Sequence, residues 1–393
     1  AAPAEPYEDL TLIGLVCLAD PLRADVRAAI EACRNAGIGV VMCTGDHAAT
    51  AAAIAGEAGI AGPDVQAIDG TELASFDPAA ATEAQGERLR AARVFARVPP
   101  AAKLSLVALH QKAGEVVAMT GDGVNDAPAL RKADIGIAMG RRGTQVAREA
   151  SDVVLLDDAF STIVEAVAQG RVIFENIRKF VVYLMSCNVS EVLVVGLAVG
   201  AGLPVPLLPL QILFLNLVTD VFPAFALGLG EGDGAVLDGP PRDPSEAVVD
   251  RARWIWIAVM GGAIALSTLA AFAASLFALD LPAEAAVTVA FLSISLAQLW
   301  NVFNVRDPRS GLFVNDVSRN RYVWFALVLC LGLISAAVLA PGLSEVLRLP
   351  YPGWAGLAVA LGSSLLPLVL GQALLMARNG RSEAEAGTPA SHS

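Results

Sequence analysis

The stretch T-G-D-G-V-N-D-A-P, from Thr120 to Pro128, decides the fold. It places two carboxylates, Asp122 and Asp126, in a Gly-rich turn that directly follows the apolar run Glu115–Met119. A strand that ends in such a turn presents its carboxylates at the carboxyl edge of a sheet, where open α/β folds bind ligands. Paired carboxylates there suit Mg²⁺, which fills its remaining positions with water and phosphate oxygens. The stretch therefore predicts an α/β domain with a magnesium site.

The residues on both sides of this stretch alternate between short apolar runs and segments with helical spacing. We expect strands over Leu10–Leu18, Gly39–Cys43, Glu115–Met119, Ile135–Met139 and Asp152–Leu156, and helices over Arg23–Asn35, Ala48–Ala58 and Ala101–Ala113. Strands that alternate with helices predict a mostly parallel sheet with helices on both faces. We assign this α/β domain to residues 10–170.

After Lys179 the pattern changes to six apolar segments, at 180–202, 208–228, 254–279, 285–304, 322–341 and 354–377. Each is close to the ~20 residues that a membrane-spanning helix requires. The hydrophobic content of 55% and the mean hydropathy of +0.59 are also too high for a soluble chain. We therefore expect an all-α transmembrane domain of six helices in a lipid bilayer over residues 171–378, followed by a disordered tail at 379–393.

The distribution of charge predicts the orientation. Basic residues gather before the first span, between the second and third, between the fourth and fifth, and after the sixth, whereas the three other loops carry only Arg348. Positive loops face the cytoplasm, so both ends and the α/β domain are expected there. These features predict a multi-pass protein of the plasma (inner) membrane. The net charge of −12 argues against nucleic acid as a partner.

Two of the apolar segments contain carboxylates, Glu191 and Asp220. Charges inside a bilayer are costly, so each carboxylate indicates a functional site. Pro223 follows Asp220 and is expected to weaken the helix and free carbonyl oxygens for coordination. Oxygen ligands alone suit a hard cation such as Ca²⁺. The side chains predicted to bind a transported cation are Asn188, Glu191, Asn216, Thr219, Asp220 and Gln298.

Several motifs, in order along the chain, resemble those of P-type cation-transporting ATPases of type II, the calcium-pump group. They are D-P-L-R at Asp20–Arg23, T-G-D at Thr44–Asp46, the lysine Lys103 in V-P-P-A-A-K, the Asp122–Asp126 turn, and N-L-V-T-D at Asn216–Asp220. The resemblance extends over residues 9–378. It implies a haloacid-dehalogenase-like (Rossmann-like) cytoplasmic domain that uses Mg²⁺ and ATP.

The resemblance also implies roles for individual residues. In the family's phosphoryl transfer, the catalytic group would be Thr44, Gly45, Asp46, Lys103, Asn125 and Asp126. Asp20, Arg23 and Asp46 would contact the nucleotide. Asp122 would bind Mg²⁺, with Asp126 supporting the metal. By the same resemblance, Gln298 stands where two-site calcium pumps carry a glutamate, and an ion-binding role and a structural role for it are equally plausible.

Other family motifs are absent from the sequence. It contains no D-K-T-G-T, which carries the phosphorylated aspartate, no actuator T-G-E, no K-G-A, and no P-E-G-L-P of the first four helices. The strand-like Val153–Leu156 precedes Asp157 but lacks the K-T-G-T that follows the nucleophile. We therefore expect the C-terminal half of a pump, with residues 1–9 a remnant of the return from the nucleotide-binding domain. Its partner would be the missing N-terminal half, and this chain alone is expected to be inactive.

Three functions are compatible with these features. The first is part of an ATP-driven cation pump, for Ca²⁺ ahead of Mn²⁺, Na⁺ or K⁺. The second is a non-catalytic pseudo-pump in the membrane. The third is a membrane-tethered magnesium-dependent phosphatase, against which the missing nucleophile argues. Nothing in the sequence separates the first two.

The basic loops predict the sidedness of labelling. A cysteine at position 205, between the first two spans, should react with a membrane-impermeant thiol reagent from outside the cell. A cysteine at position 243, between the second and third spans, should react only after permeabilisation. The reverse pattern of labelling would show that the charge distribution does not give the orientation.

Overall fold

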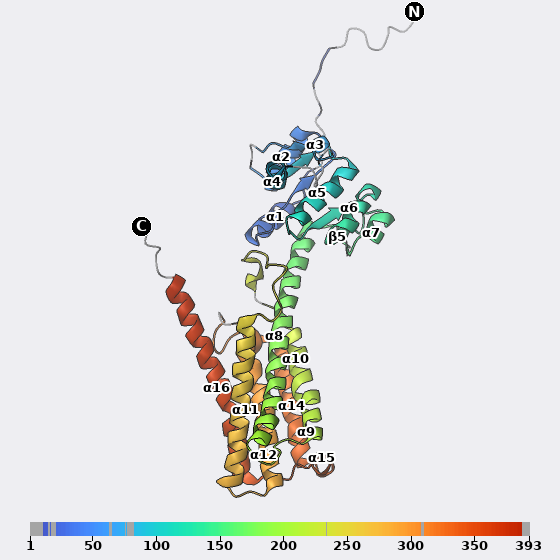
Figure 1. The fold of residues 1–393 in the computed structure, drawn as a ribbon. Helices are drawn as coiled ribbons and strands as arrows, with labels where there is room; N and C mark the ends of the chain where they lie inside the picture. Colours follow the sequence, from blue (N-terminus) through green and yellow to red (C-terminus); the bar gives the residue numbers. More distant parts are fainter. Residues whose placement is uncertain are drawn as a thin grey trace, which may run out of the picture. The chain divides into compact units, whose positions relative to one another are not determined.

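The computed structural model describes residues 11–14, 16, 21–62, 65–74, 76, 82–232, 234–307 and 310–386. The chain divides into two compact units. The first comprises Ala1–Ala166 with Leu237–Pro241, and the second comprises Val167–Val236 with Arg242–Ser393. Figure 1 identifies the elements of each unit.

The first unit has an α/β fold. Its elements in chain order are α1 (Val26–Asn35), β1 (Met42–Cys43), α2 (Ala48–Ala58), β2 (Ile68–Asp69), α3 (Gly70–Ala74), α4 (Glu83–Ala91), β3 (Val94–Ala96), α5 (Pro100–Lys112), β4 (Ala118–Gly121), η1 (Val124–Asp126), α6 (Ala127–Lys132), β5 (Ile135–Met139), α7 (Gln145–Ala150) and β6 (Val153–Leu155). The described strands form two three-stranded sheets, in the orders β1-β3-β2 and β4-β5-β6. All pairings are parallel, as the alternation of strands and helices predicted.

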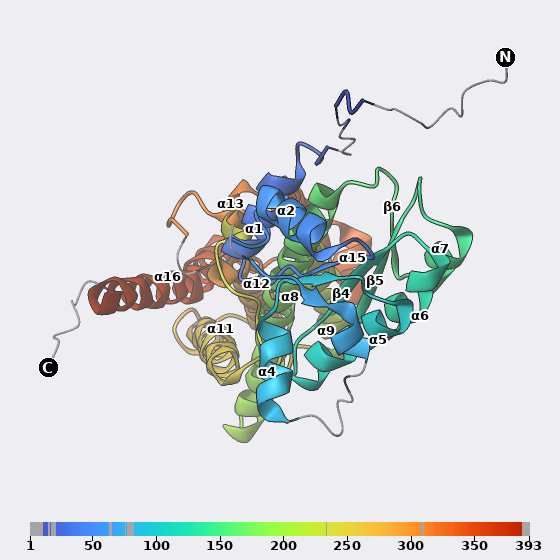
Figure 2. The same cartoon turned by 90° about the horizontal axis from the view of Figure 1, so that it is seen from above.

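Buried strands and small helical residues form the core of this unit. Every residue of β3 is buried, and Phe95 at its centre is fully enclosed among Leu73, Val98 and Leu106. In the other sheet, β5 packs against α6 and α7, which Figure 2 shows beside it. Strands β1 and β4 belong to different sheets, and the turn after each lies at the carboxyl end of a parallel strand, where α/β folds place their sites.

The expected α/β elements are present, with differences at particular segments. Helix α2 and strand β5 have the predicted bounds, and α5 is displaced by one residue. The strand expected over Leu10–Leu18 is not formed at residues 11–14 and 16, and its other residues lie outside the described ones. Apolar, β-branched composition is not sufficient for a strand, because it also requires a paired neighbour. Strand β3 was missed because three apolar residues between two arginines show no periodicity.

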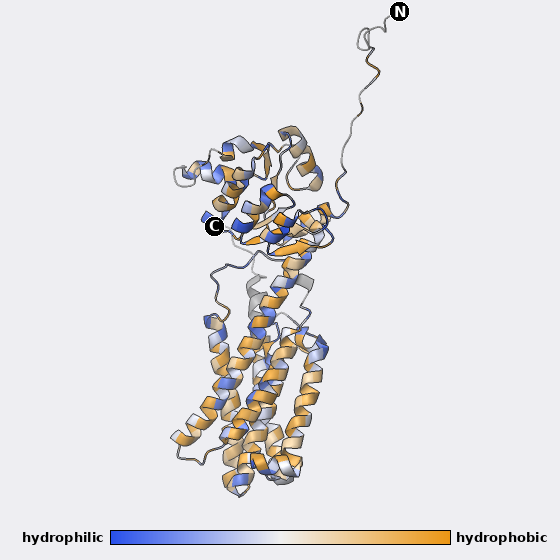
Figure 3. Ribbon diagram, turned by 90° about the vertical axis from the view of Figure 1, so that its right-hand side faces the viewer, coloured by the Kyte–Doolittle hydropathy of each residue, from blue (hydrophilic) through white to orange (hydrophobic). Residues whose placement is uncertain are grey.

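The second unit is helical. It contains α8 (Phe160–Gly200, which begins in the first unit), α9 (Pro209–Leu215), η2 (Asn216–Asp220), α10 (Val221–Gly228), η3 (Gly234–Leu237), α11 (Arg251–Phe277), α12 (Ala283–Asn301), η4 (Val302–Val305), α13 (Asp316–Arg319), α14 (Arg321–Leu339), α15 (Pro341–Leu347) and α16 (Gly353–Ala386). Within the described residues, six helical spans are long and apolar enough to cross a membrane. Figure 3, coloured by residue hydropathy, shows that hydrophobic residues predominate along these helices. The predicted fold class, an α/β domain followed by a six-helix transmembrane domain, is confirmed.

The fourth span, which is the least hydrophobic of the six, lies at the centre of the bundle. It runs from Ala283 to Val305. Its most apolar 18-residue segment has a mean hydropathy of 1.6, and 89% of that segment is buried. Helix α12 packs against α11, α14 and α16. A helix that faces other helices does not need the hydropathy of one that faces lipid, which explains the weak sequence signal.

The ends of the transmembrane unit differ from the expected boundaries. The first unit ends at Ala166, inside the continuous helix α8, where no turn residue marks a boundary. Helix α16 continues to Ala386, eight residues into the tail that was expected to be disordered at 379–393. Residues 387–393 and the expected remnant at 1–9 lie outside the described residues.

Candidate functional site

An ion pair between Lys103 and Asp126 lies at the centre of the candidate catalytic site. Lys103, in the first turn of α5, places Nζ 2.6 Å from Oδ1 of Asp126. The other carboxylate oxygen of Asp126 accepts the backbone N–H groups of Asp122 (3.3 Å) and Gly123 (3.2 Å). Both oxygens of Asp126 are therefore engaged, and this side chain closes the turn after β4 onto the lysine.

Gly121 is required for the close approach of Asp126 to this turn. A Cβ atom at position 121 would lie 2.6 Å from the Cβ of Asp126, closer than side chains approach one another. The absence of a side chain thus lets Asp126 fold back over the end of β4.

Asp122 is the candidate ligand for Mg²⁺. Its side chain is exposed at the carboxyl end of β4 and makes no hydrogen bond or ion pair with any residue that the structure describes. Asn125, on η1, is also exposed beside it. A free carboxylate next to a carboxylate held by lysine fits Mg²⁺, which binds proteins through one or two carboxylates and keeps several waters.

The T-G-D turn follows β1 and is fixed by its own side chains. The Thr44 hydroxyl donates to Oδ2 of Asp46 (2.8 Å), and the Asp46 N–H donates to the Thr44 oxygen (3.2 Å). The Thr44 N–H also donates to the Phe95 carbonyl, which ties the turn to β3. Thr44, Gly45 and Asp46 thus form one ordered loop at a sheet edge.

Cys43 shows that the ends of β1 and β4 lie close together. Burial raises the pKa of its thiol to about 11, while the charges of nearby Lys103 and Asp126 act on it in opposite directions. The thiol is therefore protonated at neutral pH and does not serve as a nucleophile. The sequence predicted Cys43 at the end of a strand but gave no sign that it lies near Lys103 and Asp126.

The expected nucleotide contacts are only partly described. Asp20 lies outside the described residues. Arg23 donates from Nη1 to the backbone carbonyl of Asp158 at 2.5 Å, so in this structure it holds the turn before α8.

Asp157 caps the start of α8. Its carboxylate accepts the Thr162 hydroxyl (2.7 Å) and the Ala159 N–H (3.0 Å), and these bonds, the hydroxyl first, lower its pKa below the usual value. This structural role accounts for an aspartate after an apolar strand.

In the membrane unit, Gln298 joins two of the predicted cation ligands. It lies on α12 and is fully buried. Its Nε2 donates to Oε1 of Glu191 (3.1 Å), and its Oε1 accepts the Thr219 hydroxyl (2.8 Å). The amide therefore uses both ends to position neighbours from α8 and η2.

The remaining predicted ligands are arranged differently. Asp220 is 4% exposed, and its Oδ1 has no hydrogen-bond partner among the described residues, while the Cys187 thiol hydrogen-bonds to its carboxylate. Asn188 is exposed and donates to the Leu184 carbonyl, and Asn216 is half-buried. Glu191, Thr219, Asp220 and Gln298 thus lie together in the interior, whereas Asn188 and Asn216 lie at its margin.

No dense metal cluster is formed. Among the residues that the structure describes, no three His, Cys, Asp or Glu side chains converge closely enough to hold a metal ion. A cation near Asp220 would therefore need amide, hydroxyl or carbonyl oxygens in addition to the two carboxylates.

Pro223 was expected to free carbonyl oxygens for coordination, but two carbonyls of the preceding turn, those of Thr219 and Val218, already accept hydrogen bonds from neighbouring helices. Proline has no N–H, so one carbonyl of this turn lacks its helical donor where the chain forms the π-helix η2. The Tyr183 hydroxyl donates to the Thr219 carbonyl (2.6 Å), and the Cys330 thiol donates to the Val218 carbonyl (3.1 Å). Tyr183 and Cys330 were missed, because only the fold brings them to this turn.

Comparison with known proteins relates each unit of the chain to a protein family. Residues 204–376 match the family model described as cation transporting ATPase, C-terminus. Residues 1–134 match that of the haloacid dehalogenase-like hydrolases. Both matches agree with the resemblance to P-type cation-transporting ATPases that the sequence motifs carry. The first unit is thus a haloacid-dehalogenase-like domain, and the second is the membrane domain of a multi-pass protein.

Curated relatives match almost the whole chain. It is 40% identical over 371 residues to a calcium-transporting ATPase of Bacillus subtilis, covering 94% of this chain and 41% of the relative. It is 39% identical to calcium-transporting ATPase 1 of Bacillus cereus (94% and 43%) and 38% identical to calcium-transporting ATPase 1 of Lactococcus lactis (92% and 40%). The chain therefore spans less than half the length of these relatives.

The free carboxylate of Asp122 predicts a weak Mg²⁺ site. Millimolar Mg²⁺ should slow amide hydrogen exchange over the turn 121–126, because the ion neutralises the carboxylate and orders the loop. Asp122→Asn should abolish this response, whereas Glu87→Gln, which alters an exposed carboxylate on α4, should preserve it. An undiminished Mg²⁺ response in Asp122→Asn would rule out this residue as the ligand.

The Tyr183 hydroxyl should stabilise the membrane unit. Tyr183→Phe leaves the Thr219 carbonyl without its donor in an apolar interior, at a cost of about 1–3 kcal/mol. Thermal unfolding in detergent should show a lower melting temperature, with no comparable change in Tyr351→Phe, whose ring is exposed. Equal melting temperatures for Tyr183→Phe and wild type would show that the Thr219 carbonyl finds another donor.

Proposed function

We propose that this chain forms the magnesium-binding part of the catalytic site and much of the cation path of an ATP-driven pump that exports Ca²⁺ from the cytoplasm. The nucleophilic aspartate would come from residues outside this chain, in the same polypeptide or in a partner. The observation that carries the proposal is the combination of two sites in one chain. One is a Lys103–Asp126 pair beside a free Asp122, and the other is a buried carboxylate pair at a helix distortion.

The arrangement of the first unit supports phosphoryl transfer. Within the described residues, β1 pairs only with β3 and β4 only with β5, so each leaves one edge open. A strand that carries the nucleophile fits between these edges. Its carboxylate would then meet Lys103, Thr44 and Asp122, which come from the turns at the same sheet edge.

Each residue of the turns has a task in that chemistry. Mg²⁺, held by Asp122, would offset the charge of the phosphoryl group. Lys103 supplies fixed positive charge, and Asp126 keeps its ammonium group in place at 2.6 Å. Thr44 and Asn125 offer a hydroxyl and an amide to phosphoryl oxygens, and positioning with electrostatic stabilisation is what such a transfer requires. ATP would be the phosphoryl donor, and Asp20, Arg23 and Asp46 would contact the nucleotide.

The membrane unit supports a hard cation as cargo. Glu191 and Asp220 are both buried, and one oxygen of Asp220 lacks a partner among the described residues. A buried carboxylate oxygen without a donor is costly unless a cation or proton occupies it. The relatives' names favour Ca²⁺ over Mn²⁺, Na⁺ or K⁺. The plasma (inner) membrane is the site that the basic loops favour.

A pseudo-pump is the alternative. The sequence printed above contains no D-K-T-G-T, and a chain without it could bind a cation without turnover. Transport by the assembled protein separates the two functions.

Asp220 should be decisive for transport. In vesicles that contain the complete pump, ATP should drive ⁴⁵Ca²⁺ uptake, and Asp220→Asn should lower the apparent Ca²⁺ affinity by at least about tenfold, equivalent to ~1.4 kcal/mol. The change keeps the size of the side chain but removes its charge from a low-dielectric site. Glu191→Gln should have a smaller effect.

Phosphorylation provides the control. In both variants phosphorylation from inorganic phosphate should persist, because the catalytic unit is unaltered, but Ca²⁺ should no longer inhibit it in Asp220→Asn. Glu345→Gln, at an exposed carboxylate on α15, should behave as wild type. Wild-type Ca²⁺ affinity in Asp220→Asn would make Asp220 structural, and Ca²⁺ binding without any ATP-driven uptake would favour the pseudo-pump.

A further inference from the structure

A pocket of about 460 Å³ opens at one end of the membrane unit, away from Glu191 and Asp220. One wall is the segment 229–232, which follows α10, and the other is the segment 310–322 between the fourth and fifth spans. Its lining includes Glu231, Val314, Asp316, Arg319, Arg321 and Tyr322. No proposed step of the pump uses these side chains.

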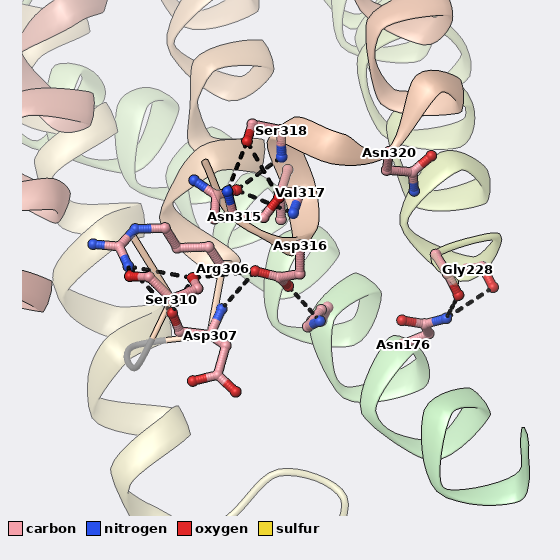
Figure 4. Close-up of polar contacts among 12 residues, drawn as sticks. Asn176, Gly228, Arg306, Asp307, Ser310, Asn315, Asp316, Val317, Ser318 and Asn320 are labelled. Atoms are coloured by element: carbon pink, nitrogen blue, oxygen red, sulfur yellow. Dashed lines mark hydrogen bonds and ion pairs between the residues drawn. The ribbon is translucent and has the colours of Figure 1, made fainter. Parts of the chain in front are cut away.

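Two asparagines fix the first wall. Asn320 donates to the Ala226 carbonyl (2.7 Å), and Asn176 donates to the Gly230 carbonyl (2.7 Å) and the Gly228 carbonyl (3.4 Å). These carbonyls lie at the end of α10, where helical donors are lacking. Figure 4 shows Asn176 directed at Gly228 and Asn320 on the neighbouring segment.

Asp316 fixes the second wall, and its own charge is neutralised there. Its Oδ2 pairs with Lys179 Nζ at 2.5 Å, and its Oδ1 accepts the Asp307 N–H (3.2 Å) and the Ser310 hydroxyl (3.3 Å). Arg306 also donates to the Ser310 carbonyl (2.6 Å), as part of the network in Figure 4. The loop is therefore a built wall of the pocket.

The pocket retains an excess of positive charge. Arg319 is exposed, and its guanidinium group donates no hydrogen bond to any residue that the structure describes. Among the described residues, the Arg321 guanidinium hydrogen-bonds only to the Tyr322 hydroxyl, with Nη2 3.1 Å from the oxygen, and it lies over the Tyr322 ring and within reach of the charge of Glu231. With Asp316 neutralised by Lys179, Glu231 is the one acidic side chain left in the described lining to oppose two guanidinium groups. An anion is the complementary ligand.

Apolar side chains adjoin the charged pocket. Leu312, Phe313 and Val314 are consecutive and exposed at 39%, 85% and 60%. Along α14, Phe325 and Val328 are exposed at 70% and 69%. Because α14 spans the membrane, its exposed apolar face meets lipid chains. A ligand that is anionic at one end and apolar along its length matches both parts.

We propose that this pocket binds the headgroup of an anionic phospholipid from the adjoining leaflet. Arg319 and Arg321 hold the phosphate, which planar guanidinium groups bind with paired N–H donors. An acyl chain lies along α14 past Phe325 and Val328. Basic pockets beside membrane helices are suited to lipid headgroups on physical grounds.

Tryptophan fluorescence offers a selective measurement. All five tryptophans lie between residues 254 and 354, so their emission reports unfolding of the membrane unit alone. In neutral detergent, phosphatidylglycerol should raise the melting temperature of the purified chain more than phosphatidylcholine does. Arg319→Gln and Arg321→Gln should each raise the lipid concentration for half the effect by about 5-fold, and together by roughly 25-fold.

Matched variants separate the pocket from general surface charge. Arg251→Gln removes an exposed arginine from the start of another span and should leave the response unchanged. Arg319→Lys with Arg321→Lys should retain part of it, which shows that the altered loop is still folded. An equal loss in Arg251→Gln, or no loss in the double glutamine variant, would overturn the proposal.

The source of the anion is tested separately. Inorganic phosphate or glycerol phosphate at the same concentration should give no shift, and an equal shift would replace the lipid by a soluble anion. A photoreactive phosphatidylglycerol should label the segment 310–325, and labelling only elsewhere would overturn the proposal. None of these measurements requires transport, so a failure of the proposed pump function would leave this result distinguishable.

Discussion

The membrane unit depends on the absence of one backbone hydrogen-bond donor. Pro223 has no N–H that could donate a hydrogen bond to the preceding turn. At that turn the helix forms a π-helical segment, which carries Asp220. In lipid every polar group must find its partner inside the protein. The Tyr183 hydroxyl and the Cys330 thiol donate to the carbonyls of Thr219 and Val218. The Gln298 amide hydrogen-bonds to the side chains of Thr219 and Glu191. The amide of Gln298 comes from α12, which lies at the centre of the bundle and has a modest hydropathy.

In the turn after β4, which lies in water and not in lipid, a buried carboxylate likewise finds its partners within the protein. Asp126 uses both oxygens on Lys103 and on backbone N–H groups, so it can no longer act as a free ligand. Asp122, four residues earlier, is left exposed because its neighbour is engaged. Two identical side chains in one motif thus differ in their surroundings, because Asp126 closes the turn and Asp122 is left free for the proposed Mg²⁺. The spacing alone predicted the pair but did not distinguish these surroundings.

Local patterns predicted the elements, and tertiary contacts decided the rest. Helix α2, strand β5 and the six spans have strong periodicity or length, so the sequence located them closely. The short β3 and the approach of Cys43 to Lys103 and Asp126 depend on contacts with distant segments, which no local pattern records. For the proposed cation site, the sequence singled out Glu191 and Asp220 as carboxylates within apolar segments, and both are buried. It also included Asn188, which donates to its own helix at the exposed margin, because helical spacing cannot tell which neighbours cover a face.

Within the described residues, β1 and β4 each leave one strand edge open, and these edges connect the findings to the proposed function. Exposed edges are a hazard for a protein, because they invite pairing with other chains. Here β1 and β4 are short, at two and four residues, and both end in turns that surround Lys103. A strand placed between them would pair with both edges. It would also bring its carboxylate next to Lys103. The same insertion would therefore stabilise the fold and supply the nucleophile, so that assembly of the sheet and assembly of the catalytic site become a single event.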